Sequence, residues 1–147
     1  MTTLRLARNL LKSGCSVLPI SGKRPRMKWK RLQSETLTTS ELNYWFSDTS
    51  SSVGLITGRL SGFVVIDADD AEAVRIVRDY CPFTQMSRPT ARGEHFFYRW
   101  PGYDVANSTG VMGQQIDIRG DGGYVVIKPN LTGFSREVPI FNPDWLG

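Results

Sequence analysis

Two carboxylates at the end of an apolar stretch are the side chains in this sequence best suited to chemistry. Asp67 and Asp69 follow the apolar residues 64–66 in the segment VVIDADD. Because a strand alternates its faces, the two carboxylates project the same way and repel each other unless a cation lies between them. Mg²⁺ and Mn²⁺ prefer carboxylate oxygens, which favours a divalent metal site that includes Asp67. The alternative is that Asp69 or Asp70 caps a helix over residues 71–80, and for Asp70 this capping role is favoured.

A third carboxylate lies in the alternating segment QIDIR. Asp117 and Arg119 fall on one face of this expected strand, and Ile116 and Ile118 fall on the other. The charged face therefore offers a carboxylate beside a guanidinium. Its alternative role is a surface ion pair, which contributes little to stability.

The loop GDGG at residues 120–123 follows this strand directly. Glycine allows positive φ and lets a ligand approach the backbone closely, so we expect Gly122 and Gly123 to lie near a bound ligand. A tight hairpin into the strand 124–127 is the alternative explanation of these glycines.

The single histidine of the chain, His95, opens a strand after a short loop that contains Arg92 and Gly93. This is a suitable place to bind phosphate oxygens, although a lone histidine is also a common structural residue. A nucleophilic triad is excluded because there is no second histidine and no GxSxG segment. A P-loop is excluded as well, since Arg24 stands where the motif needs a hydroxyl residue.

Positive charge is concentrated at the start of the chain. Residues 1–31 hold nine of the 18 Lys and Arg side chains and no acid, and the remaining residues carry a net charge of −5. This asymmetry is typical of proteins that bind nucleic acid. The basic side chains of this segment could bind a template backbone while the indole of Trp29 stacks on a base. These basic residues are Lys23, Arg24, Arg26, Lys28 and Lys30. The alternative is a solvated basic loop whose Trp29 packs against the core.

Hydrophobic periodicity predicts the elements that must position these residues. Helices are expected over 3–13, from Thr38, where Glu41 completes a capping box, and over 70–80. Strands are expected at 15–20, 53–56, 63–67, 85–88, 95–100, 115–119 and 124–127. Mixed helix and strand units followed by a strand-rich half predict an α+β fold with one sheet or two abutting sheets.

Length and composition limit the remaining possibilities. At 147 residues, the chain is expected to form one domain over 1–147. No apolar run approaches the ~20 residues of a membrane span, and basic residues interrupt the N-terminal apolar pattern, which excludes a signal peptide. Cys15, Cys81 and one histidine are too few for a structural zinc site, so we expect no zinc. Two separate cysteines fit reduced thiols, which predicts a cytoplasmic protein. Because no apolar run is long enough to cross a bilayer, we expect no membrane partner.

Three segments, taken together, resemble the bifunctional primase–polymerase (Prim-Pol) family of the archaeo-eukaryotic primase superfamily. They are VVIDAD at 64–69, TARGEHFFYR at 90–99 and QQIDIRGDGGYVVIKP at 114–129, in the order that the family shows. The segment TGRLSG before the first motif and the N-terminal PISGKRPRMKW are similar to the family as well. The resemblance covers residues 15 to 129.

The resemblance implies two abutting α/β modules, the second similar to an RNA-recognition motif, with the active site in the cleft between them. It implies a template-dependent DNA primase and polymerase of DNA replication, a nucleotidyltransferase that uses two divalent ions, Mg²⁺ or Mn²⁺. By position, Asp67, Asp69 and Asp117 would hold these metals, and His95 would bind the triphosphate of the incoming nucleotide. Local position adds the nucleotide-binding residues Arg92, Gly93, Arg119, Gly122 and Gly123.

The expected partners are a single-stranded DNA template, nucleoside triphosphates and a helicase in the same or a separate chain. Members of the family occur on mobile elements such as plasmids and phages. The domain would either act alone or form the N-terminal part of a longer replication protein.

Two features depart from the family pattern. Glu94 replaces a glycine often seen before the histidine, and its charge would weaken triphosphate binding if it faced inward. The zinc-binding insertion of some relatives is missing from the sequence as well. Glu94 therefore supports an alternative, a non-catalytic primase-like module that binds DNA for a replication initiator. A metal-dependent nuclease is a weaker alternative, since it leaves His95 and the glycine loop without a triphosphate to bind.

Overall fold

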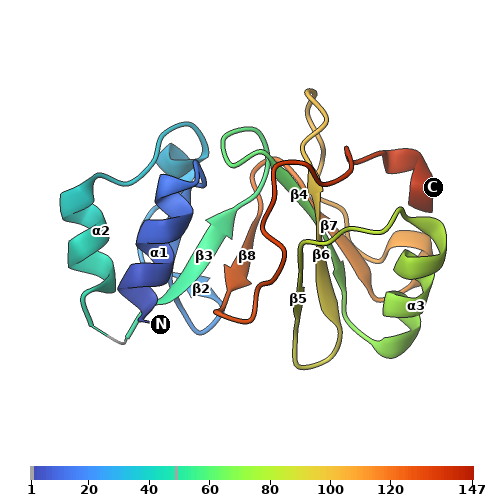
Figure 1. Ribbon diagram of the computed structural model, residues 1–147, viewed down its shortest axis with the longest axis horizontal. Coiled ribbons are helices and arrows are strands. Elements are labelled where there is room, and N and C mark those ends of the chain that lie inside the picture. Colours follow the sequence, from blue (N-terminus) through green and yellow to red (C-terminus); the bar gives the residue numbers. More distant parts are fainter. Residues whose placement is uncertain (1, 49) are drawn as a thin grey trace.

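The chain folds into two four-stranded sheets and three α-helices, as a computed structural model of residues 2–48 and 50–147 shows (Figure 1). The helices of this described part are α1 (Thr3–Lys12), α2 (Thr39–Phe46) and α3 (Ala71–Tyr80), with short 3₁₀ turns at Lys30–Gln33, Val111–Gly113 and Pro143–Leu146. The predicted α+β class is confirmed.

Every strand pairing in the two sheets is antiparallel. The first sheet has the order β2-β1-β3-β8, with β2 at Arg24–Pro25, β1 at Val17–Ser21, β3 at Ser52–Ile56 and β8 at Tyr124–Ile127. The second has the order β5-β6-β4-β7, with β5 at Ser87–Pro89, β6 at Glu94–Arg99, β4 at Phe63–Ala68 and β7 at Ile116–Arg119. The strand β8 belongs to the first sheet although it is last in the sequence.

The chain crosses between the sheets twice on this path, from β3 to β4 and from β7 to β8. The hairpin considered for the glycine loop 120–123 is therefore wrong, because β7 and β8 do not pair. The loop instead lies against the other crossing. The Thr57 amide donates to the carbonyl of Gly123 over 3.0 Å, and the Thr57 hydroxyl donates to that of Gly120 over 2.6 Å.

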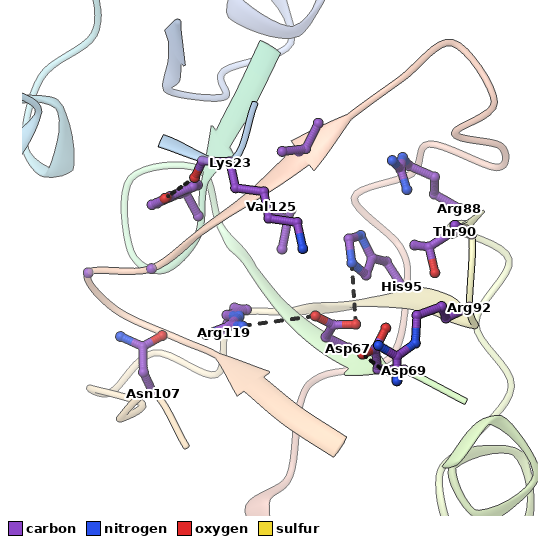
Figure 2. A pocket seen from close by; sticks show the side chains of 15 residues that line it. Lys23, Asp67, Asp69, Arg88, Thr90, Arg92, His95, Asn107, Arg119 and Val125 are labelled. Atoms are coloured by element: carbon purple, nitrogen blue, oxygen red, sulfur yellow. Dashed lines mark hydrogen bonds and ion pairs between the residues drawn. The ribbon is translucent and has the colours of Figure 1, made fainter. Parts of the chain in front are cut away.

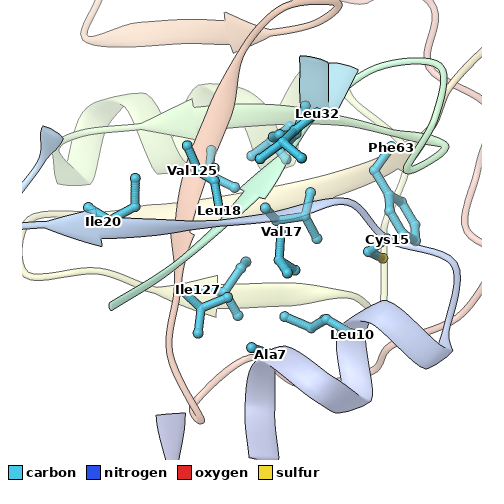
Figure 3. Close-up of a cluster of buried hydrophobic side chains, with 14 of the residues drawn as sticks. Ala7, Leu10, Cys15, Val17, Leu18, Ile20, Leu32, Phe63, Val125 and Ile127 are labelled. Atoms are coloured by element: carbon cyan, nitrogen blue, oxygen red, sulfur yellow. The ribbon is translucent and has the colours of Figure 1, made fainter. Parts of the chain in front are cut away.

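The first hydrophobic cluster lies between α1 and the two sheets. Helix α1 buries Ala7 and Leu10 against the apolar side chains of β1 and β8 (Figure 3). Phe63 and Phe97 of the second sheet join the same cluster, so one core connects the sheets. Each such side chain contributes about 1.5–3 kcal/mol when it is fully buried.

The second cluster forms where α3 covers the outer face of the second sheet. Ile76 and Val77 of the helix pack with Val64 and Ile66 of β4. Alternate residues of β4 therefore serve different cores, since Val65 belongs to the first cluster.

Both predicted helix starts are present. The Thr38 side chain accepts from the Glu41 amide at 3.2 Å while the Glu41 carboxylate accepts from the Thr38 amide at 3.0 Å, the reciprocal bonds of a capping box. The Asp70 carboxylate accepts from the Ala73 amide at 2.7 Å and so caps α3. Asp70 thus has a structural role, which leaves Asp67 and Asp69 for chemistry.

None of the helices described is long and apolar enough to cross a bilayer. Cys15 and Cys81 are free and buried, and burial raises the pKa of each thiol to about 11. Both cysteines are therefore protonated at neutral pH and act as small apolar side chains.

Candidate functional site

Four ionisable side chains form a row across the inner face of the second sheet. Arg88 of β5 is the cross-strand partner of His95 on β6, which pairs with Asp67 on β4, and Asp67 pairs with Asp117 on β7. Residues directly opposite each other in a sheet point to the same face, with Cβ atoms about 4.5–5.5 Å apart. The pairing therefore brings together four groups that are up to 50 positions apart in the sequence.

The neighbours of these residues show which face they occupy. Ile66, Phe96 and Ile116 alternate with the row and pack in the cluster under α3. The row therefore faces the first sheet. Further along the same face, Val65 and Phe97 enter the shared core, so the face is apolar at one end and charged at the other.

A cavity of about 710 Å³ opens over the charged end of this face, and residues of both sheets line it (Figure 2). The second sheet and its loops contribute Asp67, Asp69, Arg88, Thr90, Ala91, Arg92, His95, Asn107 and Arg119; Lys23, Gly122, Gly123, Tyr124, Val125 and Val126 line the opposite side. The structure thus brings eight of the predicted site residues around one space: Lys23, Asp67, Asp69, Arg92, His95, Arg119, Gly122 and Gly123. Gly93 and Asp117 lie just outside the lining.

Asp67 is the central acid of the cavity. One carboxylate oxygen lies 3.4 Å from Nε2 of His95, the other lies 4.0 Å from the Arg119 guanidinium, and the side chain is 21% exposed. Burial raises the pKa of Asp67, but a hydrogen bond and charge from His95 and the charges of Arg119 and Arg88 lower it by more. Asp67 is therefore an anion at neutral pH, in a site surrounded by positive charge.

The guanidinium of Arg119 lies between the carboxylates of Asp117 and Asp67. The Arg119 guanidinium binds the Asp117 carboxylate at 3.0 Å and reaches toward Asp67, so that it lies between the two acids. The other Asp117 oxygen accepts from the Gly110 amide at 3.2 Å. The ion pair considered as an alternative for Asp117 and Arg119 is thus present, but it faces the row of ionisable groups.

The carboxylates suit a divalent cation in type, but they do not converge on one point. Over residues 2–48 and 50–147, no three His, Cys, Asp or Glu side chains gather into a cation site. Asp69 is 44% exposed and lies 3.6 Å from Arg92 at the rim. Carboxylate oxygens are the ligands that Mg²⁺ and Mn²⁺ prefer. The donors fit such an ion by their chemistry, while Arg119 lies between two of them.

Sequence reasoning missed Arg88. The residue is only 6% exposed, and its pKa is lowered because burial disfavours the cation more than Asp67 favours it. The short segment SRP gives no sign of its partner, because only the pairing of β5 with β6 places Arg88 opposite His95. The one available signal was an arginine seven positions before the histidine, which cannot be distinguished from a surface residue.

Asp121 was not predicted either, because the segment GDGG points to its glycines and not to the acid between them. Its carboxylate accepts from the Arg59 and Val105 amides and from the Trp100 indole, at 2.9–3.0 Å. Burial raises the pKa of Asp121, whereas these bonds and the Arg59 charge lower it by more. Asp121 thus joins the two crossings between the sheets.

The glycine of the histidine motif has a structural explanation. A Cβ atom on Gly93 would overlap the carbonyl oxygen of Ala68, at the end of β4. Any larger residue would therefore push the start of β6, with His95, away from Asp67. Gly122 is different, because it has a φ of 76° beside the cavity and few atoms near it.

Glu94 does not face the cavity. Since His95 points inward, its neighbour points to the opposite face of the sheet, where the Glu94 carboxylate binds Arg78 of α3 at 2.8 Å. The condition under which Glu94 would repel a triphosphate is therefore not met.

The basic loop is only partly connected to the cavity. Lys23 lines it, and its carbonyl oxygen accepts from the Tyr124 hydroxyl at 2.8 Å. Trp29 is partly buried against the first core and meets Tyr124 edge to face at 5.3 Å, so the packing alternative describes its position. Arg26 binds Ser50 and Ser51 and lies over the Trp45 ring. Arg24, Lys28 and Lys30 are exposed outside the cavity lining.

Comparison with known protein families gives a match to the family described as "Bifunctional DNA primase/polymerase, N-terminal", over residues 7–144. No curated protein matched the chain. The matched range contains both sheets and the whole cavity.

Proposed function

Because the chain belongs to the bifunctional DNA primase/polymerase (Prim-Pol) family, we propose that it is a template-dependent nucleotidyltransferase of DNA replication. The observation that carries this proposal is the row of Arg88, His95, Asp67 and Asp117 across one sheet, whose first three members line a cavity between both sheets. Such a cavity has room for a nucleotide, since ligand sites measure about 300–1,000 Å³. We further propose that this cavity is a cleft between two modules, the second of which is similar to an RNA-recognition motif.

The metal ligands in this proposal are Asp67, Asp69 and Asp117. Two bound Mg²⁺ or Mn²⁺ ions would supply Lewis-acid chemistry, which activates the attacking 3′-hydroxyl and balances charge on the reacting phosphate. Asp67 is already ionised and so needs no proton release before it binds a cation. Arg119 loses its role between the acids once they hold metal, and its guanidinium becomes available for a phosphate oxygen.

The remaining cavity residues bind and orient the nucleotide. His95 holds its imidazole beside Asp67 and presents a ring nitrogen to the phosphates, and Arg92 at the rim adds an exposed positive charge. Little covalent chemistry is required of the protein, because positioning and fixed charge supply most of the rate enhancement. Gly122 and Gly123 form the opposite wall, where backbone atoms can approach the sugar or base.

The test is synthesis on a template. The protein with single-stranded DNA, labelled nucleoside triphosphates and Mn²⁺ or Mg²⁺ is expected to form dinucleotides or to extend a primer, and to form neither without the template. A separate titration with Mn²⁺ and nucleotide measures binding. If the protein bound DNA but showed no metal-dependent nucleotide binding and no product, the non-catalytic module would be correct instead. Degradation of single strands without added nucleotide would indicate the nuclease.

The exposed lysines of the basic loop give a prediction about template binding. Replacing Lys28 and Lys30 together by Gln removes two positive charges that lie outside the cavity. We expect weaker binding of oligo(dT), by about 5- to 10-fold near 0.1 M KCl. The slope of log K against log salt should also be shallower by about 1.4. Fluorescence anisotropy over a series of KCl concentrations measures both quantities.

The matched control replaces two exposed basic residues of α1, Arg5 and Lys12, by Gln. The net charge then falls by the same amount, and the slope of log K against log salt should not change. Equal losses in the two double variants would mean that DNA responds to total charge and not to the loop.

A further inference from the structure

Two buried nitrogens at one corner of the cavity have no hydrogen-bond partner within the described residues. They are Nε of Arg88 and Nδ1 of His95. The two residues are 6% and 8% exposed, and they are cross-strand neighbours on β5 and β6. The large majority of buried side-chain polar atoms in proteins are paired, because an unpaired one costs about 1–3 kcal/mol. Two adjacent exceptions indicate that a ligand supplies the missing acceptor.

The environment of Arg88 indicates what kind of ligand this is. Its only hydrogen bond within the described chain is a long one, 3.3 Å from Nη1 to the Pro89 carbonyl, and no carboxylate lies within 4.0 Å of it. Asp67 compensates this buried guanidinium only at longer range, without an ion-pair contact, so its charge is incompletely balanced. Its planar donors match phosphate oxygens in a paired geometry. The ligand group is therefore an anion with several oxygens.

The position of Arg88 in the row indicates which phosphate it meets. Arg88 lies beyond His95, on the side away from Asp67 (Figure 2). Two strand spacings of about 4.8 Å put the Cα atoms of Arg88 and Asp67 on the order of 10 Å apart. If the reacting phosphate lies at Asp67, the outer phosphates of the same nucleotide extend past His95 to Arg88.

We propose that Arg88 binds the terminal phosphate of the incoming nucleotide and makes the site select triphosphates over monophosphates. The inference rests on the proposed function, because it assumes that a nucleotide occupies the cavity with its reacting phosphate at Asp67. Arg88 then acts as a specificity residue, and His95 bridges the region between the metal ligands and Arg88.

The experiment compares ATP, ADP and AMP as probes by calorimetry in Mn²⁺, for the wild type, Arg88→Met and Arg88→Lys. The wild type is expected to bind ATP more tightly than AMP. Arg88→Met should lose about 10- to 100-fold in ATP affinity, with AMP affinity within twofold of wild type, since a hydrogen bond to a charged group is lost only with ATP. The ATP affinity of Arg88→Lys should lie between those of the wild type and Arg88→Met, because lysine keeps the charge but not the planar donors.

The matched control is Arg99→Met, which removes an exposed arginine from β6 outside the cavity lining and should leave both affinities unchanged. Equal losses for ATP and AMP in Arg88→Met, or no loss for ATP, would overturn the inference. Failure of the wild type to bind any of the three nucleotides would instead overturn the proposed function.

A second measurement uses the wild type alone, in case Arg88→Met does not fold. The Arg88 Nε–H signal in nitrogen-15 NMR should shift and become protected from exchange when ATP is added, but not when AMP is added. An Nε–H signal that responds equally to both nucleotides, or to neither while ATP binds, would show that Arg88 does not meet the terminal phosphate.

Discussion

Asp67→Asn is expected to reduce nucleotide incorporation by about 1000-fold or more, a loss of roughly 4 kcal/mol of transition-state stabilisation. Asp67 is the acid that the row places between His95 and Asp117, and the surrounding positive charge keeps it ionised. Asparagine has nearly the same shape, so the fold should persist, but it removes the charge that a divalent ion requires. Rates of primer extension at saturating Mn²⁺, with thermal unfolding measured in parallel, separate a catalytic defect from a structural one.

The control for this variant is Asp70→Asn, three residues further along the chain. Asp70 caps α3 through the Ala73 amide, and asparagine is an equally good N-cap. Its incorporation rate and its thermal stability should both match the wild type. Full activity in Asp67→Asn would show that Asp67 is not a metal ligand, whatever the control does.

Asp121→Ala is expected to lower the free energy of unfolding by about 2–4 kcal/mol. The variant leaves three donors without their acceptor: the Arg59 and Val105 amides and the Trp100 indole. A loss of this size is a large fraction of a typical stability of about 5–15 kcal/mol. Urea denaturation followed by tryptophan fluorescence measures the change.

The control is Asp104→Ala, because Asp104 also binds Arg59, at 2.9 Å, but through two exposed side chains. Exposed ion pairs contribute about 0–1 kcal/mol, so this variant should stay close to the wild type. If Asp104→Ala were as destabilising as Asp121→Ala, the stabilisation would come from the Arg59 side chain and not from the three donors.

The lowered pKa of Asp121 predicts a pH dependence of stability. The pKa of Asp121 in the folded chain lies below its ordinary value of 3.8, so its contribution is complete above that pH and is lost as the pH falls through the folded pKa. The wild type should therefore lose more stability than Asp121→Asn between neutral pH and pH 3. Parallel decline of the two proteins would contradict this assignment.

The sequence determined the local elements because each depends on residues close together in the chain. The apolar stripe of residues 3–13 became α1, and Thr38 with Glu41 formed the expected capping box. Alternation in QIDIR correctly separated Asp117 and Arg119 from the two isoleucines. The order of the three motifs also identified the family, which the match over residues 7–144 confirms.

Strand order and register were decided only by the tertiary structure. Nothing local shows that β8 returns to the first sheet, so the glycine loop 120–123 could equally have been a hairpin. Glu94 could equally have faced the cavity until the partners of β6 were known. Both outcomes depend on contacts between segments that are distant in the sequence.

The same distinction explains the two residues that the sequence did not reveal. Arg88 becomes a cavity residue because β5 pairs with β6, and Asp121 becomes a structural centre because the two crossings between the sheets meet at its carboxylate. A residue type and its spacing show which chemistry a side chain can do. Hydrogen bonding between distant strands determines which side chains meet, and so which of them can do that chemistry together.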